Sequence, residues 1–238
     1  MRAWSVFQLK EADVRVCSPR ADLVEAEVRR LRAVLEAYID RQPAFKAALC
    51  PIDLLADAPP IAVAMADAAR ACEVGPMAAV AGAVAQAAAE VALAAGVDEA
   101  IVENGGDTWI ASPREVTVGL YAGENPLSGR LALSIHPDRL PLSVCSSSGR
   151  FGHSLSFGDC DLATVVARCG ALADAAATLA ANSVRTIDDV EPTLERVAAI
   201  PGVDGVLIVK ADRVGVAGNL PRLVKADDPD FELKTRHR

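Results

Sequence analysis

The sequence predicts an α+β fold in which antiparallel sheets carry helices on one face. Two observations favour it: strand-like segments occur in blocks separated by turn residues, and helical segments occur in blocks of their own. The sequence does not show the regular alternation of single strands and helices that builds a doubly wound parallel sheet. With 238 residues, the chain suits one large domain or two small ones.

The N-terminal part is predicted to form a β-hairpin followed by helices. Apolar and polar residues alternate on both sides of the polar segment 10–13, which is typical of two paired strands, 4–9 and 14–17. The apolar residues that follow recur at spacings of three and four, as on one face of a helix. The predicted helices are 21–40, a short one after Pro43, 61–72 and, after the break at Gly75-Pro76, 77–95, which ends at Gly96 as a left-handed C-cap.

The rest of the chain is predicted to contain mainly strands. Short segments separated by Gly, Pro, Asn and Asp are typical of a meandering antiparallel sheet. The predicted strands are 100–103, 108–111, 115–121, 130–135, 142–146, 152–157, 162–167, 205–210, 213–217 and 222–226, and the predicted helices are 170–182 and 190–199. The charged residues from about 227 to 238 are expected to form a frayed tail.

The composition argues against several classes of protein. There are 24 Lys and Arg residues against 32 Asp and Glu residues, and the resulting charge of −8 disfavours nucleic acid as a partner. The 6 cysteines include no Cys-x-x-Cys pair and are interpreted as reduced thiols. No signal-peptide pattern is recognised, and the alanine-rich segment 77–95 is interrupted by Gln86 and Glu90, so no membrane span is expected. We therefore expect a cytoplasmic protein.

The turn Asn104-Gly105-Gly106-Asp107 is a candidate ligand-binding site. Two glycines without Cβ let a ligand approach the backbone closely, and Asn104 and Asp107 offer polar contacts. The alternative is an ordinary hairpin turn, because glycine closes such turns at positive φ.

A second candidate is a loop rich in hydroxyl groups and exposed amides, which can surround phosphate or carboxylate oxygens. Its candidate residues are Ser146, Ser147, Ser148, Gly149 and His153. The alternative is an ordinary polar hairpin loop. A serine hydrolase is not favoured, because the sequence contains no Gly-x-Ser-x-Gly motif.

Two helical segments carry further candidates. Asp174, Thr178 and Asn182 lie at i, i+4 and i+8 and form one polar stripe on an alanine-rich helix. The stripe is either solvated or, through Asp174 and Thr178, part of a Mg²⁺ site built from oxygen ligands. The small residues from Gly75 to Gly82 either start a helix whose amides attract an anion or allow close helix packing, which we favour.

Five motifs in order resemble the ApbE-like superfamily, whose best-known members are FAD:protein FMN transferases. They are VGPM, VENGGD, YAGENPLSG, CSSSGRFGHSLSFG and LADAAAT, and over nearly the whole chain they are similar to the uncharacterised bacterial and archaeal branch of that superfamily. The resemblance implies a single domain over 1–238, built of two tunnelling-fold-like lobes with antiparallel sheets and helices packed on one face. It also implies a cleft between the lobes for a flavin nucleotide.

The same resemblance implies two cofactors, Mg²⁺ and a flavin nucleotide (FAD or FMN). Asp174 and Thr178 match the residues that hold Mg²⁺ in flavin transferases, and the Gly-Gly-Asp turn matches a nucleotide contact. Two departures weigh against FMN transfer. The transferase pattern Gly-x-x-Lys-Gly-Tyr is replaced by the segment 80–84, and His-x-x-Asp-Pro-x-x-Gly is replaced by the segment 153–158.

Two further functions stay open at this point. Membership of the branch suggests an accessory factor in sulfur assimilation, from sulfide to homocysteine, for which Cys145 offers a thiol if it is not simply a buried cysteine. Alternatively, the chain is a non-catalytic ligand-binding or assembly module. In that case the apolar helices 61–72 and 77–95 would form the interface of a homo-oligomer.

Overall fold

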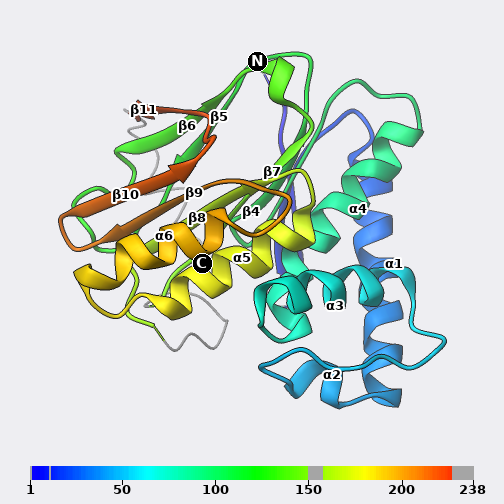
Figure 1. The fold of residues 1–238 in the computed structure, drawn as a ribbon. Helices are drawn as coiled ribbons and strands as arrows, with labels where there is room; N and C mark the ends of the chain where they lie inside the picture. Colours follow the sequence, from blue (N-terminus) through cyan, green and yellow to red (C-terminus); the bar gives the residue numbers. More distant parts are fainter. Residues whose placement is uncertain (1, 11, 150–157, 227–238) are drawn as a thin grey trace.

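The computed structural model describes residues 2–10, 12–149 and 158–226. At its centre is an eight-stranded antiparallel sheet, covered by helices on one face and by a three-stranded sheet on the other (Figure 1). The large sheet has the order β1 (Ser5–Leu9), β2 (Ala12–Cys17), β3 (Ala100–Asn104), β4 (Asp107–Ala111), β7 (Leu142–Ser147), β8 (Leu162–Ala167), β9 (Val203–Lys210) and β10 (Arg213–Gly218). The small sheet has the order β11 (Arg222–Lys225), β6 (Leu131–Ile135) and β5 (Val116–Leu120).

The helical layer lies below and to the right of the large sheet in Figure 1. Its two central helices, α4 and α5, pack against each other, α4 also on β3 and β4, and α5 also on β7 and β8. The helices are α1 (Ala21–Arg41), α2 (Ala44–Ala47), α3 (Pro60–Cys72), α4 (Val80–Ala94), α5 (Gly170–Ser183) and α6 (Val190–Ala198), with short 3₁₀ segments η1 (Pro76–Ala79), η2 (Pro137–Arg139) and η3 (Ile187–Asp189).

Side chains of the central strands alternate between two hydrophobic cores. In β4, Trp109 and Ala111 face the helices, whereas Ile110 faces the small sheet. In β7, Cys145 belongs to the core under the helices and Val144 to the core under the small sheet. Because both faces of the sheet are covered, β8, with the sequence LATVVA, is buried along its whole length. The first residue of β4, Asp107, has the parity of Trp109, so its side chain points toward the helical layer.

The predicted α+β class is confirmed, with antiparallel sheets and helices on one face. Gly96 ends α4 at a φ of +88°, as the left-handed C-cap predicts, but the predicted helix 77–95 begins as the separate 3₁₀ segment η1. The predicted strand 152–157 and the predicted tail lie outside the described residues. Strands from both halves of the chain join one large sheet, and the two tunnelling-fold-like lobes stay a prediction.

Among the described residues, one helical segment, Pro76–Ala94, is long and apolar enough to cross a membrane by length and composition. One face of the same segment packs inside the protein, where Ala85, Ala88 and Ala92 are 0% exposed. A helix in the core of a protein passes this test equally well, so the segment is weak evidence for a membrane span. The apolar residues of this helix that were a candidate subunit interface are largely used within the chain.

Candidate functional site

Several chain segments that the sequence singles out meet at one end of the large sheet. The register pairs Thr108 at the start of β4 with Val144 in β7, and Ser147 at the end of β7 with Ala163 in β8. The β3–β4 turn, the end of β7 and the start of β8 therefore lie side by side. The sheet itself brings the Gly-Gly-Asp turn next to the first residues of the Ser-rich loop.

The Gly-Gly turn is a tight β-hairpin connection. Asn104 and Asp107 are register partners, and Gly105 and Gly106 between them have φ values of +66° and +108°. Residues with a Cβ rarely adopt such values, so the turn requires glycine for its conformation. The hairpin interpretation is thus correct, and the binding role of the turn depends on the side chains beside it.

Asp107 is buried and anchored to the neighbouring strand. The residue is only 7% exposed. The Ser146 N–H donates a hydrogen bond to Asp107 Oδ1 over 3.2 Å. On the other side of the turn, Asn104 Nδ2 donates to the Ala81 carbonyl oxygen over 3.4 Å. Asn104 therefore reaches the first turn of α4, and Asp107, as its register partner, lies on the same face of the sheet.

Asp174 reaches the same first turn of α4 from α5. The Gly82 N–H donates to Asp174 Oδ2 over 2.9 Å, and the residue is 9% exposed. The first amides of a helix have no partner inside the helix, and α4 has no capping side chain of its own. Asp174 therefore supplies a cap for α4 from another helix.

The two carboxyl groups influence each other. Burial raises the pKa of Asp174 well above its ordinary value, and the nearby charge of Asp107 raises it further. The amides of Gly82 and Ala81 act in the opposite direction, since they stabilise the charged form. Asp107 and Asp174, together with Asn104 and the Gly82 amide, form what we call the Asp107–Asp174 site.

The polar stripe on α5 is only partly as predicted. Asp174 is buried against α4, so the interpretation of a fully solvated stripe is wrong for this residue, while Thr178 and Asn182 are half-buried. Thr178 lies one helical turn beyond Asp174. Its hydroxyl is therefore on the same side of α5 as the buried carboxyl group.

The Ser-rich segment contributes more to strand pairing than expected. Ser146 Oγ lies 2.9 Å from Thr164 Oγ1 on β8, and Ser148 Oγ donates to the Cys160 carbonyl oxygen over 3.2 Å. The Gly149 N–H donates to the same carbonyl oxygen over 2.8 Å. Ser147, the last residue of β7, is half-buried. His153 lies outside the described residues.

Cys145 is a buried thiol. Its Sγ lies 3.8 Å from the Gly170 carbonyl oxygen, and the residue is 0% exposed. Burial and the charges of Asp107 and Asp174 raise the pKa of this thiol well above its ordinary value. A nucleophilic cysteine needs the opposite environment, so the geometry supports a packing role.

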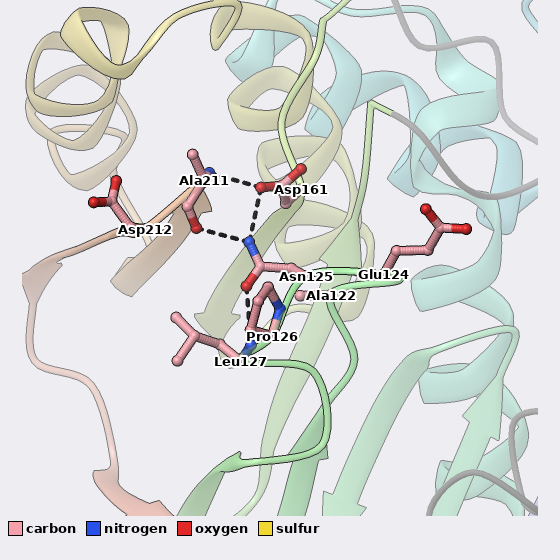
Figure 2. Close-up of a pocket in the computed structure, with 8 residues that line it drawn as sticks. All are labelled: Ala122, Glu124, Asn125, Pro126, Leu127, Asp161, Ala211 and Asp212. Carbon is pink, nitrogen blue, oxygen red and sulfur yellow. Dashed lines mark hydrogen bonds between the residues drawn. The ribbon is translucent and has the colours of Figure 1, made fainter.

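A pocket of about 540 Å³ opens at the same end of the large sheet (Figure 2). It lies between the turn that joins β5 to β6, the start of β8 and the turn after β9. Asn125 Nδ2 donates to Asp161 Oδ2 (2.9 Å) and to the Ala211 carbonyl oxygen (2.8 Å), which fastens the YAGENPLSG turn to the large sheet. The lining includes the carboxylates of Glu124 and Asp212, so this pocket disfavours phosphate groups.

Two features of the site were missed in the sequence. The pairing of Asp107 with Asp174 and the use of Gly82 as the amide partner of Asp174 join residues far apart in the chain. The local signal for the Gly82 contact is the glycine at the start of α4, which the sequence indicates as a packing residue. That interpretation is correct as well, because a Cβ on Gly82 would lie 2.2 Å from the Gly170 carbonyl oxygen.

Comparison with known proteins identifies the family. The family model described as AbpE bacteria matches residues 5–202. The UPF0280 protein of Methanocaldococcus jannaschii is 39% identical over 208 residues (85% of this chain, 84% of that protein), and the UPF0280 protein of Methanocella arvoryzae is 38% identical over 238 residues (99% and 96%).

Solved structures agree at the level of the fold. The flavinyl transferase ApbE of Pseudomonas stutzeri superposes with a TM-score of 0.58 at 11% identity, covering 92% of this chain and 95% of that chain. A variant of the flavin transferase ApbE of Vibrio cholerae gives a TM-score of 0.56 at 10% identity, covering 92% and 97%. The chain therefore belongs to the ApbE-like family, in its UPF0280 branch.

Proposed function

We propose that this protein binds a flavin nucleotide, or a closely related nucleotide, together with Mg²⁺ at the Asp107–Asp174 site. The observation that carries the proposal is the pair of buried carboxyl groups beside the glycine turn and the first turn of α4. Burying two acidic groups close together is unfavourable unless a cation or a proton offsets their charge. The flavin transferases that share this fold support a flavin as the ligand.

The donors present fit Mg²⁺. Asp107 and Asp174 offer carboxylate oxygens and Thr178 offers a hydroxyl oxygen, and Mg²⁺ prefers such ligands at about 2.1 Å. Among the described residues, no cluster of three or more His, Cys, Asp or Glu residues could hold a metal alone. We therefore expect the ion to bind weakly by itself and tightly with a phosphate-bearing ligand, whose oxygens complete its coordination.

Each residue of the site has a separate role in this proposal. Asp107 and Asp174 would hold the cation, which when bound neutralises charge on the ligand phosphates. The Gly105-Gly106 turn lets those phosphates approach the backbone, because a Cβ is missing there. Asn104 keeps the turn next to α4 through its contact with Ala81.

The proposal is limited to binding, because two features weigh against FMN transfer. The segment 80–84 lacks the lysine and the aromatic residue of the transferase pattern. In addition, the amide of Gly82 in this segment is occupied by Asp174. The ligand would therefore be held mainly by the cation and the glycine turn.

The proposal is tested by titrating the protein into FAD and following flavin fluorescence, with Mg²⁺ or with a chelator. We expect binding in Mg²⁺ that is much weaker in the chelator. Asp174→Asn should remove most of this difference, because the amide keeps the shape of the side chain but not its charge. Asp188→Asn, which neutralises an exposed carboxylate after α5, is the matched control.

Competition with ADP and with FMN defines the ligand class. Displacement of FAD by ADP alone would indicate a nucleotide site, and displacement by FMN alone would indicate a site for the flavin half. Equal FAD affinity in Mg²⁺ and chelator, or no binding at all, would contradict the proposal.

A further inference from the structure

Helices α4 and α5 cap each other. The Gly82 N–H in the first turn of α4 donates to Asp174 Oδ2 of α5 over 2.9 Å. In return, the Gly170 N–H at the start of α5 donates to Gln86 Oε1 of α4 over 2.7 Å. Neither helix has a capping side chain of its own. Each helix therefore depends on the other to satisfy an amide at its start.

The spacing of the four residues makes this arrangement a unit. Gly82 and Gln86 are four residues apart on α4, and Gly170 and Asp174 are four apart on α5, so each pair shares one helix face. The two glycines let the backbones touch. A Cβ on Gly82 would lie 2.2 Å from the Gly170 carbonyl oxygen, and a Cβ on Gly170 would lie 2.3 Å from the Gly82 carbonyl oxygen. We call these four residues the α4–α5 lock.

We propose that Gln86 is a positioning residue for the Asp107–Asp174 site, acting through α5 rather than on the ligand. By accepting from the first amide of α5, Gln86 fixes how far α5 slides along α4 and thereby keeps Asp174 against the Gly82 amide. The two glycines contribute no side chains of their own at this crossing, so the hydrogen bonds of Gln86 and Asp174 are the polar contacts that fix the position of one helix along the other. This inference deepens the proposed function, on which its cation-binding part rests.

Gln86 is itself held in the orientation that this role requires. Its Nε2 donates to Glu90 Oε1 over 2.8 Å, so the amide nitrogen is directed to Glu90 and the oxygen to Gly170. Gln86 lines a separate cavity of about 370 Å³ between α1, α3, α4 and the start of α5, which has neither Asp107 nor Asp174 in its lining. A ligand at the carboxyl pair therefore does not need to touch Gln86.

The first test measures the lock directly by following the Gly82 amide in ¹H–¹⁵N spectra of the full chain. Gln86→Met removes the acceptor but keeps the length of the side chain. We expect an upfield shift and faster hydrogen exchange of the Gly82 amide, because Asp174 is no longer held against it. The exchange variant Gln86→Glu/Glu90→Gln keeps an acceptor oxygen, an amide partner and the net charge, and should restore the Gly82 signal.

The second test measures Mn²⁺ affinity by electron paramagnetic resonance in the presence of FAD, with Mn²⁺ in place of Mg²⁺. We expect Gln86→Met to weaken Mn²⁺ binding about tenfold, as is typical when a residue that orients a metal ligand is lost. The exchange variant should recover the affinity of the wild type.

The control separates positioning from general stability. Gln42→Met removes a comparable hydrogen bond at the end of α1, where Gln42 Nε2 donates to the Asp53 carbonyl oxygen over 2.7 Å. It should lower the melting temperature while leaving the Gly82 amide and Mn²⁺ affinity unchanged.

If Gln86→Met behaves like Gln42→Met, the positioning role is wrong. If the wild type binds no Mn²⁺ with FAD, the proposed function fails, and the Gly82 amide still decides the role of Gln86.

Discussion

Asp174 is costly to bury, and its surroundings only partly compensate. Loss of solvation and the proximity of Asp107 favour the protonated form, whereas the amides of Gly82 and Ala81 favour the charged form. A residue chosen for capping alone could be Ser, Thr or Asn, which accept the same hydrogen bond without a charge. A carboxyl group at this position is better explained if it meets a cation during function.

The raised pKa of Asp174 predicts a pH-dependent stability. Because the pKa of Asp174 in the folded state lies above the ordinary value of an Asp side chain, the folded state binds the proton more tightly than the unfolded state. The stabilising contribution is therefore complete below that value and is lost as pH rises toward the folded pKa. Asp174→Asn does not titrate, so its free energy of unfolding relative to wild type should increase as the pH rises above the ordinary pKa of an Asp side chain, about 4.

Urea denaturation of both proteins across this pH range measures the difference. Added Mg²⁺ with FAD should reduce the loss of unfolding free energy that the wild type shows at high pH. It should have little effect on the unfolding free energy of the variant. A difference in unfolding free energy that does not change with pH, or that falls as pH rises, would show that the carboxyl group is not perturbed as described.

At the scale of helices and strands, most of the fold could be predicted from local patterns. Helix α1 follows from apolar residues spaced three and four apart, and the Gly-Gly turn marks the β3–β4 hairpin.

The site was predictable in part, because Asp107 and Asp174 both stand in motifs. Their proximity was not, since the hydrogen bond from Gly82 to Asp174 spans 92 residues and that from Gly170 to Gln86 spans 84. Local periodicity carries no information on which helices cross.

The α4–α5 crossing predicts a large effect of a small substitution. In a helix, Gly→Ala normally stabilises by about 1 kcal/mol. At Gly82 the new Cβ would lie 2.2 Å from the Gly170 carbonyl oxygen, so the helices must separate. We expect Gly82→Ala to lower the free energy of unfolding by about 3 kcal/mol.

Gly105→Ala is the matched comparison for this prediction. No atom lies within 4 Å of a Cβ at Gly105, so its substitution costs only the strain of a φ of +66°, about 1 kcal/mol. Urea denaturation of the two variants gives both values. An equal or smaller loss for Gly82→Ala would mean that the crossing can relax and that close contact is not essential.

At the scale of the molecule, the large sheet separates two cores with different tasks. The core under the helices contains α4, α5 and the residues that position the Asp107–Asp174 site, whereas the core under the small sheet contains residues such as Leu133 and Ile135. The small sheet also provides the YAGENPLSG turn beside the pocket of Figure 2. Stability of the small sheet and cation binding should therefore be separable by mutation.

Leu133→Ala tests this separation. Leu133 is 0% exposed between the two sheets, and removing its side chain should lower the free energy of unfolding by about 3 kcal/mol. Its register partner Leu223 is 41% exposed, so Leu223→Ala should cost about 1 kcal/mol or less. FAD affinity in Mg²⁺ should be unchanged in both variants below their melting temperatures. A loss of affinity that follows the loss of stability would show that the two cores are not independent.

The central claim is that Asp107 and Asp174 together hold a divalent cation for a nucleotide ligand. Titration calorimetry of FAD into wild type, Asp107→Asn, Asp174→Asn and the double variant, each with Mg²⁺ and with chelator, tests it most directly. We predict that each single variant loses most of the Mg²⁺-dependent affinity, that the double variant loses little more, and that all four proteins are similar in chelator. Equal losses in Mg²⁺ and in chelator would contradict the claim, because the carboxyl groups would then act only in the structure.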